Sequence, residues 1–249
     1  MEDKKLIDSI GEIGRLLLKY GAEIYRVEES LTRMCQSYGY EFVNVFALPS
    51  YFTLSVKNNN DFSYTLSKRS RQNRINLDKI YELNNLVRYV CQNKPDISYL
   101  QAEIKRINNI KTNYYLVFLG YGIGSGFFTT FFGGGLSETI VALFIGFILY
   151  FFILLMEILE INNLVSTLLS SMLITFLAIV ARNWGLTINS DAIIIGCLMI
   201  LTPGVAITNS FRDIMGGDYI SGTARMLEAL LIAVFIAIGA GTMTMILGG

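Results

Sequence analysis

The chain has 249 residues, of which 53% are hydrophobic, and its mean hydropathy of +0.48 is too high for a purely soluble protein. Residues 1–112 hold 17 of the 20 Lys and Arg residues, whereas residues 113–249 hold three bases against seven acids. Histidine is absent, which excludes Ser-His-Asp catalysis and His-ligated zinc, and neither half has the basic stripe of a nucleic-acid binder. We therefore predict a soluble domain over 1–112 joined to a transmembrane domain over 113–249.

Helical patterns come first. Apolar residues from Leu6 to Tyr20 recur at helical spacing, which predicts an amphipathic helix over the first 20 residues. Gly21 interrupts this pattern, and a second helix is predicted over Glu23 to Tyr38. No secretory signal is visible, because the first long apolar run starts only near Tyr114. The three cysteines form no CxxC pair and are expected to be reduced.

The period then changes to that of strands. The segments "YEFVNVFAL", "YFTLSV" and "FSYTLSKR" are short and rich in aromatic and β-branched residues, and turn residues separate them, which predicts three strands. Helical patterns return at about Leu77 to Cys91 and Ile97 to Ile107, divided by Pro95. The soluble part is therefore expected to be an α+β domain of order ααβββαα.

The second half is expected to be an α-helical polytopic membrane domain. Each of its five hydrophobic segments is near the ~20 residues that span a bilayer. They lie at about 114–132, 138–156, 163–181, 191–212 and 222–247. If the soluble domain is cytoplasmic, 19 of the 20 Lys and Arg residues lie inside, as the positive-inside rule requires.

Small residues recur in the first and last of these segments. The first carries two overlapping GxxxG patterns between Gly120 and Gly126, and the last carries Ala229, Ala233, Ala237 and Gly241 at intervals of four. Such patterns are typical of close helix packing in lipid, although small residues are also common in membrane helices generally.

The fourth segment contains "LTPGVAITNSFRD", residues 201–213. Inside a helix Pro203 removes a backbone donor and Gly204 lowers the cost of bending, so we predict a break there. Backbone freed at membrane depth is tolerated only inside protein or beside a wet cavity. Thr208 and Arg212 are four residues apart, as are Asn209 and Asp213, so both pairs project from one surface of the helix.

Further polar or flexible residues accompany this break. Arg225 and Glu228 are three apart and able to pair. The alternative is that Arg212, Asp213, Arg225 and Glu228 lie at the cytoplasmic interface and only pair with one another. Gly133 and Gly134 end the first segment and form either a second functional interruption or a flexible outer turn.

Three blocks of the chain resemble the bacterial threonine/serine exporter family. They are "LTPGVAITNSFRDIMGGDYISGTARMLEALLIA" (201–233), "LLLKYGAEIYRVEESLTRM" (16–34) and "FFGGG" (131–135), in the family's order. The resemblance implies an inner-membrane exporter of small amino acids or related carboxylates, with a cytoplasmic amino-terminal domain. Residues 1–112 lack histidine, a nucleophile motif and a metal-ligand cluster, so no cofactor and no enzymatic activity are expected.

Full-length members of that family look like this chain followed by a second membrane block, and this chain ends at Gly249 without one. That departure resembles the split form of the family, which is associated with export of dicarboxylates such as succinate. It implies a second membrane subunit or a homo-oligomer. The alternatives are a membrane-anchored enzyme and a regulatory subunit, each with its activity in the soluble domain.

The candidate residues fall into two groups. Those expected to bind substrate lie at the break and on the polar face after it: Thr202, Pro203, Gly204, Thr208, Asn209 and Arg212. Those expected to couple or gate transport are Asp213, Arg225, Glu228, Gly133, Gly134, Arg26 and Glu28. The Arg26 motif, which also contains Gly21, Glu23 and Glu29, is hypothesised to dock on the 212–225 loop and gate the inner mouth. The alternative is a solvated salt-bridge face.

Overall fold

The protein divides into two compact units. Its computed structural model describes residues 2–58, 63–70 and 75–247. The first unit consists of Met1–Lys111 together with Ile207–Met226, and the second consists of Thr112–Ala206 together with Leu227–Gly249. A short segment from late in the chain therefore packs with the amino-terminal part.

The elements of the amino-terminal part follow the predicted order ααβββαα. They are α1 (Glu2–Lys19), α2 (Ile24–Ser37), β1 (Phe42–Leu48), β2 (Tyr51–Lys57), β3 (Ser63–Arg69), α3 (Leu77–Asn93) and α4 (Ile97–Asn108). Each begins and ends within two residues of the predicted bounds. Local sequence periodicity was therefore sufficient to locate them.

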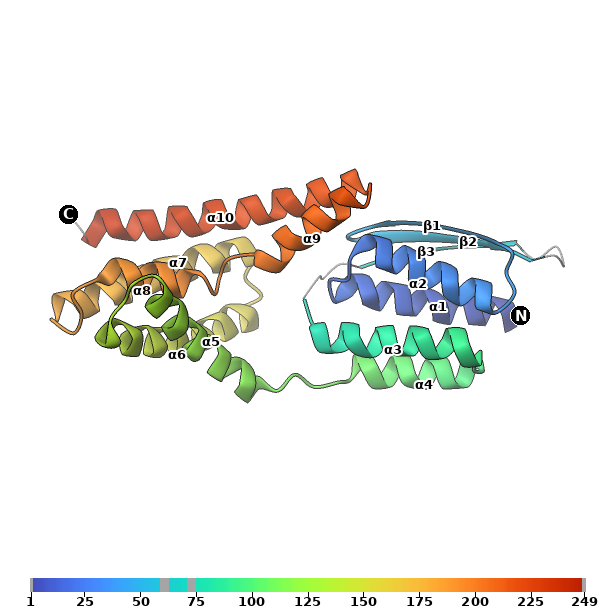
Figure 1. The fold of residues 1–249 in the computed structure, drawn as a ribbon, viewed down its shortest axis with the longest axis horizontal. Coiled ribbons are helices and arrows are strands. Elements are labelled where there is room, and N and C mark those ends of the chain that lie inside the picture. The colour runs from blue at the N-terminus through green and yellow to red at the C-terminus, as the bar shows by residue number, and fades with distance from the viewer. Residues whose placement is uncertain (1, 59–62, 71–74, 248–249) are drawn as a thin grey trace. The chain divides into compact units, whose positions relative to one another are not determined.

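The first unit is layered. The strands form an antiparallel sheet in the order β1-β2-β3, with Phe52 opposite Ala47 on β1 and Lys68 on β3. Helices α1 and α2 cover one face of the sheet, and α3 and α4 pack on the far side of these two helices (Figure 1). Along β2, Phe52, Leu54 and Val56 alternate with more exposed residues, because successive side chains in a strand point to opposite faces. The buried face supplies the core beneath α1 and α2.

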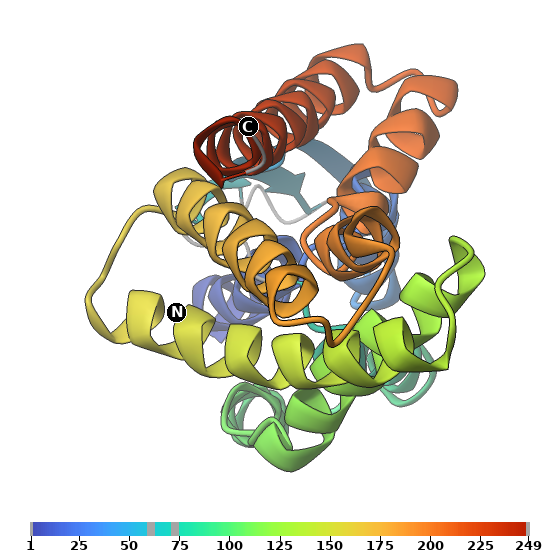
Figure 2. The ribbon, with the colours of Figure 1, turned by 90° about the vertical axis from the view of Figure 1, so that its left-hand side faces the viewer.

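The second unit contains the membrane helices. They are α5 (Tyr114–Phe131), α6 (Leu136–Ile158), α7 (Asn163–Asn183), α8 (Ser190–Leu198), the first turn of α9 (Gly204–Met215) and most of α10 (Tyr219–Leu247). Helix α7 lies between α6 and α10 (Figure 2). The predicted break is confirmed, because α8 ends at Leu198 and α9 begins only at Gly204.

Among the described residues, three helices, α6, α7 and α10, are long and apolar enough to cross a membrane. Two predicted spans are not among them. Helix α5 has 18 residues but carries four glycines and three tyrosines, which lower its apolar character. The fourth predicted span is divided into α8, with nine residues, and α9, with 12. The five-span count therefore stays a prediction.

Glycines allow close helix contacts inside the second unit. A Cβ atom at Gly146 would lie 2.4 Å from the carbonyl oxygen of Tyr121, and one at Gly196 would lie 2.5 Å from the backbone nitrogen of Thr129. These contacts join α5 to α6 and to α8. On α10 the residue that approaches α7 is Gly239, where a Cβ atom would lie 2.5 Å from the Leu168 oxygen.

The predicted small-residue ladder on α10 is largely exposed within this chain. Ala229 is buried, but Ala233, Ala237 and Gly241 are exposed. The contact with α7 is made instead at Gly239, which is two residues from Ala237 and so lies on a different side of the helix.

Candidate functional site

The turn between α1 and α2 offers backbone groups for binding. Helix α1 ends in a Schellman motif, in which Gly21 N–H donates to Leu18 O at 3.1 Å and Ala22 N–H donates to Leu17 O at 3.0 Å. Gly21 has φ +86°, a conformation that glycine adopts at little cost. The carbonyls of Gly21 and Ala22 are then left for partners outside the helix.

Residues of α9 and α10 bind this turn. The Asn209 Nδ2 donates to Gly21 O at 3.3 Å, and Arg225 Nη2 donates to Ala22 O at 2.8 Å. Asp213 Oδ1 accepts a hydrogen bond from Ile24 N–H at 3.2 Å. We call this set the docking cluster: the turn residues Gly21, Ala22, Glu23 and Ile24 with Asn209, Arg212, Asp213 and Arg225.

Asp213 caps α2 from a distance. The residue at the cap position, Glu23, makes no side-chain capping bond, and Ile24 is the first residue of the helix. The first N–H groups of a helix lack partners inside it and favour negative charge. The carboxylate of Asp213 supplies both an acceptor for the Ile24 N–H and a negative charge at this helix end, although it comes from α9.

Ion pairs surround these backbone contacts. Arg212 Nη1 lies 2.7 Å from Glu23 Oε1, and Arg26 Nε lies 3.3 Å from Glu23 Oε2. Arg225 Nε lies 3.4 Å from Asp213 Oδ2. The Arg212 side chain is 55% exposed, so its pair is worth little stability, whereas Asp213 is fully buried and Arg225 nearly so. The Asp213–Arg225 pair is therefore the energetically significant one.

The α9–α10 hairpin is held closed by its own contacts. Ser210 Oγ donates to Gly222 O at 2.7 Å, and a Cβ atom at Gly222 would lie 2.9 Å from Ser210 O. The turn is a second Schellman motif, in which Gly217 has φ +92° and Asp218 N–H donates to Asp213 O at 2.9 Å. The hairpin thus fixes Asp213 on α9 next to Arg225 on α10.

One oxygen of Asp213 stands out. Among the residues that the structure describes, Asp213 Oδ2 has no hydrogen-bond donor, although the side chain is fully buried. Burial raises the pKa of Asp213, the Arg225 charge and the Ile24 N–H act in the opposite direction, and the charges of Asp218 and Glu23 raise it further. The net direction is upward, so this carboxyl holds a proton more readily than an exposed aspartate does.

The predicted gating residues of α2 have different contacts. Among the described residues, Arg26 reaches Glu23 and the Tyr25 hydroxyl, and so its link to α9 runs through Glu23. Glu28 Oε1 accepts from Ala47 N–H of β1 at 2.7 Å, and burial raises the pKa of Glu28, with the Asp218 charge adding to the increase. The residue that contacts α9 directly through its side chain is Glu23, at the cap position before α2.

The remaining predicted residues are dispersed. Thr202 donates to Met199 O at 2.6 Å beside the Pro203 break, and Thr208 is exposed. Glu228 is exposed, and its expected pairing with Arg225 is wrong within the described residues, because Arg225 turns to Asp213 and Ala22 instead. Gly133 has φ +88° and Gly134 packs against Thr129, which places both in a tight turn of the second unit.

Sequence reasoning missed Glu138, which anchors a loop in the second unit. Its side chain is 5% exposed, and Oε1 accepts hydrogen bonds from Ile188 N–H at 3.0 Å and Asn189 N–H at 3.3 Å. Glu138 lies three residues after Gly135, the last glycine of the Gly133–Gly135 run. A lone acid at the start of an apolar segment was the available signal.

The long apolar helices α6, α7 and α10 make the chain a multi-pass membrane protein. Within the described ranges, no group of three or more Cys, Asp or Glu residues is arranged to hold a metal ion. The family described as "Putative threonine/serine exporter" matches residues 8–247, so the chain belongs to this family. Comparison with curated proteins and with solved structures finds no match.

Proposed function

We propose that the protein is a secondary exporter of threonine and serine in the bacterial inner membrane. Its amino-terminal domain is cytoplasmic, and its five hydrophobic segments cross the bilayer. Family membership supports the substrate class, and the concentration of Lys and Arg in residues 1–112 supports the orientation. The activity is transport and not catalysis.

The substrate site is proposed at the break before α9. Interrupted membrane helices mark the substrate sites of many transporters. Helix α9 begins at Gly204 after Pro203, and the amino-terminal end of a helix carries partial positive charge that suits a carboxylate. Thr202 and Thr208 flank this end and are proposed to bind the rest of the substrate.

The docking cluster is proposed to be the cytoplasmic gate. It is the observation that carries this part of the proposal, because the turn Gly21–Ile24 is bound by side chains of both α9 and α10. These helices continue beyond the cluster into the membrane unit, so their release from the turn frees the segment next to the break. Asp213 is proposed as the coupling group, because it is buried with an unsatisfied oxygen, whereas Glu228 is exposed.

Two finer features are proposed from resemblance to the family. One is a second membrane subunit or a second copy of this chain in the carrier. The other is a dicarboxylate such as succinate as an alternative cargo. Both enter the experiment below as separate arms.

The experiment is efflux from liposomes that contain the purified chain and labelled threonine, serine or succinate. We expect efflux of threonine and serine that falls at least tenfold in Asn209→Ala and is unchanged in Asn163→Ala, an exposed residue at the start of α7. Efflux that requires a co-expressed membrane protein would support the second subunit. No efflux of any solute under either condition would overturn the proposal.

A further inference from the structure

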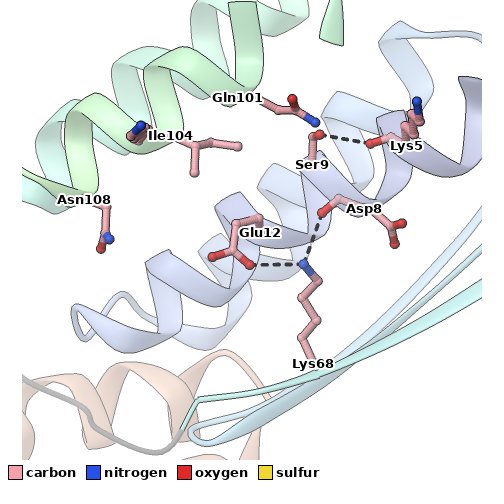
Figure 3. Close-up of a pocket in the computed structure, with 9 residues that line it drawn as sticks. Lys5, Asp8, Ser9, Glu12, Lys68, Gln101, Ile104 and Asn108 are labelled. Carbon is pink, nitrogen blue, oxygen red and sulfur yellow. Dashed lines mark hydrogen bonds and ion pairs between the residues drawn. The ribbon is translucent and has the colours of Figure 1, made fainter. Parts of the chain in front are cut away.

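A polar cavity lies in the first unit, between α1, β3 and α4. Its volume is about 340 Å³, and Figure 3 shows the side chains of α4 facing those of α1 across it. Helix α1 contributes Lys5, Asp8, Ser9 and Glu12. Helix α4 contributes Gln101, Ile104, Lys105 and Asn108.

Both helices present residues at the same spacing, i, i+3, i+4 and i+7, which places them along one face. Ile104 is the one apolar residue among those that line the cavity. Lys5, Gln101, Lys105 and Asn108 are exposed, so the cavity opens to solvent and its charged groups are accessible to a dissolved ligand.

Some of the lining charges already neutralise one another. Lys68 Nζ lies 3.1 Å from Glu12 Oε2, and Arg15 also binds Glu12. Within the described part of the chain, Lys5 and Lys105 have no ion pair. The Asp8 carboxylate accepts from the Tyr64 hydroxyl at 3.1 Å, and Lys68 Nζ donates to the Asp8 backbone oxygen at 3.2 Å. The cavity therefore presents two available cations and an available carboxylate.

This charge pattern selects a class of ligand. A dianion would meet the carboxylates of Asp8 and Glu12, and a cation would meet the lysines, each at an electrostatic cost. A zwitterion satisfies both signs, with its carboxylate near a lysine and its ammonium near Asp8. The volume is at the small end of ligand sites, which suits a small amino acid.

We propose that this cavity binds a small zwitterionic α-amino acid as an effector, separately from the transport site. The residues that bind it are Lys5, Lys105 and Asp8, with Gln101 and Asn108 as hydrogen-bonding groups. Its effect on transport rests on the proposed function, whereas binding itself does not.

A hydrogen-bonded chain links the cavity to the docking cluster. Asn108 Oδ1 accepts from the Tyr20 hydroxyl at 2.9 Å, and Lys79 donates both to Asn108 O at 2.8 Å and to the Tyr20 hydroxyl at 3.3 Å. Tyr20 is buried and directly precedes Gly21 of the docking cluster. A ligand that engages Asn108 therefore acts on a residue adjoining the gate.

The first test is equilibrium binding of labelled threonine, serine and succinate to the full chain in detergent. We expect threonine or serine binding whose affinity falls about tenfold or more in Lys5→Gln/Lys105→Gln, because charge-assisted hydrogen bonds are lost. Lys111→Gln, another exposed lysine near α4, is the matched control and should bind normally. No binding, binding of succinate alone, or full affinity in the double variant would each overturn the site.

The second test separates the effector role from export itself. Tyr20→Phe removes the hydrogen bond to Asn108 and leaves the charged lining intact. We expect Tyr20→Phe to bind threonine with wild-type affinity. In this variant the efflux rate should no longer depend on the threonine concentration at the cytoplasmic face. An unchanged dependence would overturn the coupling. Absence of efflux in the wild type, with cavity binding retained, would overturn the export proposal and leave the binding site standing.

Discussion

Asp213 combines three properties that rarely coincide in an exposed aspartate: full burial, a nearby arginine and a bond to the end of another helix. Asp213→Asn keeps an acceptor for Ile24 N–H and removes the charge. We expect the free energy of unfolding to change by less than about 1 kcal/mol, since the raised pKa of Asp213 means that folding favours its neutral form over the charged one. Asp213→Ala should cost about 3 kcal/mol, because Arg225 loses its partner. Denaturant unfolding of the purified chain measures both, with Asp218→Asn as a control.

The pH dependence of docking has a defined sign. The pKa of Asp213 is raised above its ordinary value of 3.8 by burial, so the docked state binds more protons than the undocked state between the two values. Docking should therefore strengthen as pH falls through the raised pKa, and should weaken as pH rises. Hydrogen exchange at Ile24, corrected for intrinsic exchange, measures this in the wild type. The same slope in Asp213→Asn would show that another group is responsible.

Gly21 offers a residue-scale test of the gate. Gly21→Ala places a side chain at φ +86°, at a cost of about 1–2 kcal/mol, and brings a Cβ atom to 3.1 Å from Ile75 Cγ1. Gly39→Ala has a similar φ of +90° and meets nothing within 4 Å. Both variants should lose similar stability in thermal unfolding, but only Gly21→Ala should lose efflux. Equal efflux in the Gly21→Ala and Gly39→Ala variants would show that the Gly21 turn has no part in gating.

The α9–α10 hairpin is the element on which the docking cluster depends. Gly222→Ala would force a Cβ atom to within 2.9 Å of Ser210 O and 3.0 Å of Ile214 N, both backbone atoms that cannot rotate away. We expect a loss of about 1–3 kcal/mol through overpacking, and faster hydrogen exchange at Ile24 as Asp213 moves. Gly241→Ala, on the same helix with nothing within 4 Å, should leave both measurements unchanged.

Element boundaries were predictable where the signal is local. The strand alternation along β2 and the helical spacing along α1 are repeated several times within one element, so each is over-determined. The Pro203–Gly204 break was predictable for the same reason, since proline acts on its own helix. The packing face of α10 was not, because Gly239 and Ala237 look equivalent until the neighbouring helix is known.

At the scale of the whole molecule, the number of spans sets the side on which each loop lies. With five spans and a cytoplasmic amino terminus, Leu159 faces the cytoplasm and Leu186 faces outward. If only α6, α7 and α10 cross the membrane, Leu159 faces outward and Leu186 faces the cytoplasm. Both residues are more than half exposed, so cysteines there are reachable.

The measurement is labelling by a membrane-impermeant thiol reagent in a chain whose native cysteines are replaced. We expect Leu186→Cys to react from outside intact cells and Leu159→Cys to react only after permeabilisation. Glu41→Cys, in the amino-terminal part that we propose to be cytoplasmic, is the control for that side. The reverse pattern at Leu159 and Leu186 would establish three spans.

The sequence by itself determined the element order of the amino-terminal part and the broken helix, because each depends on neighbours within a few residues. Tertiary structure decided the docking cluster. Ile24 and Asp213 are 189 positions apart, and Ala22 and Arg225 are 203 apart, so no spacing rule connects them. Their partners on the turn are mostly backbone groups, which every sequence contains. Only the folded chain specifies which carbonyl and which N–H are left open, and which buried carboxylate reaches them.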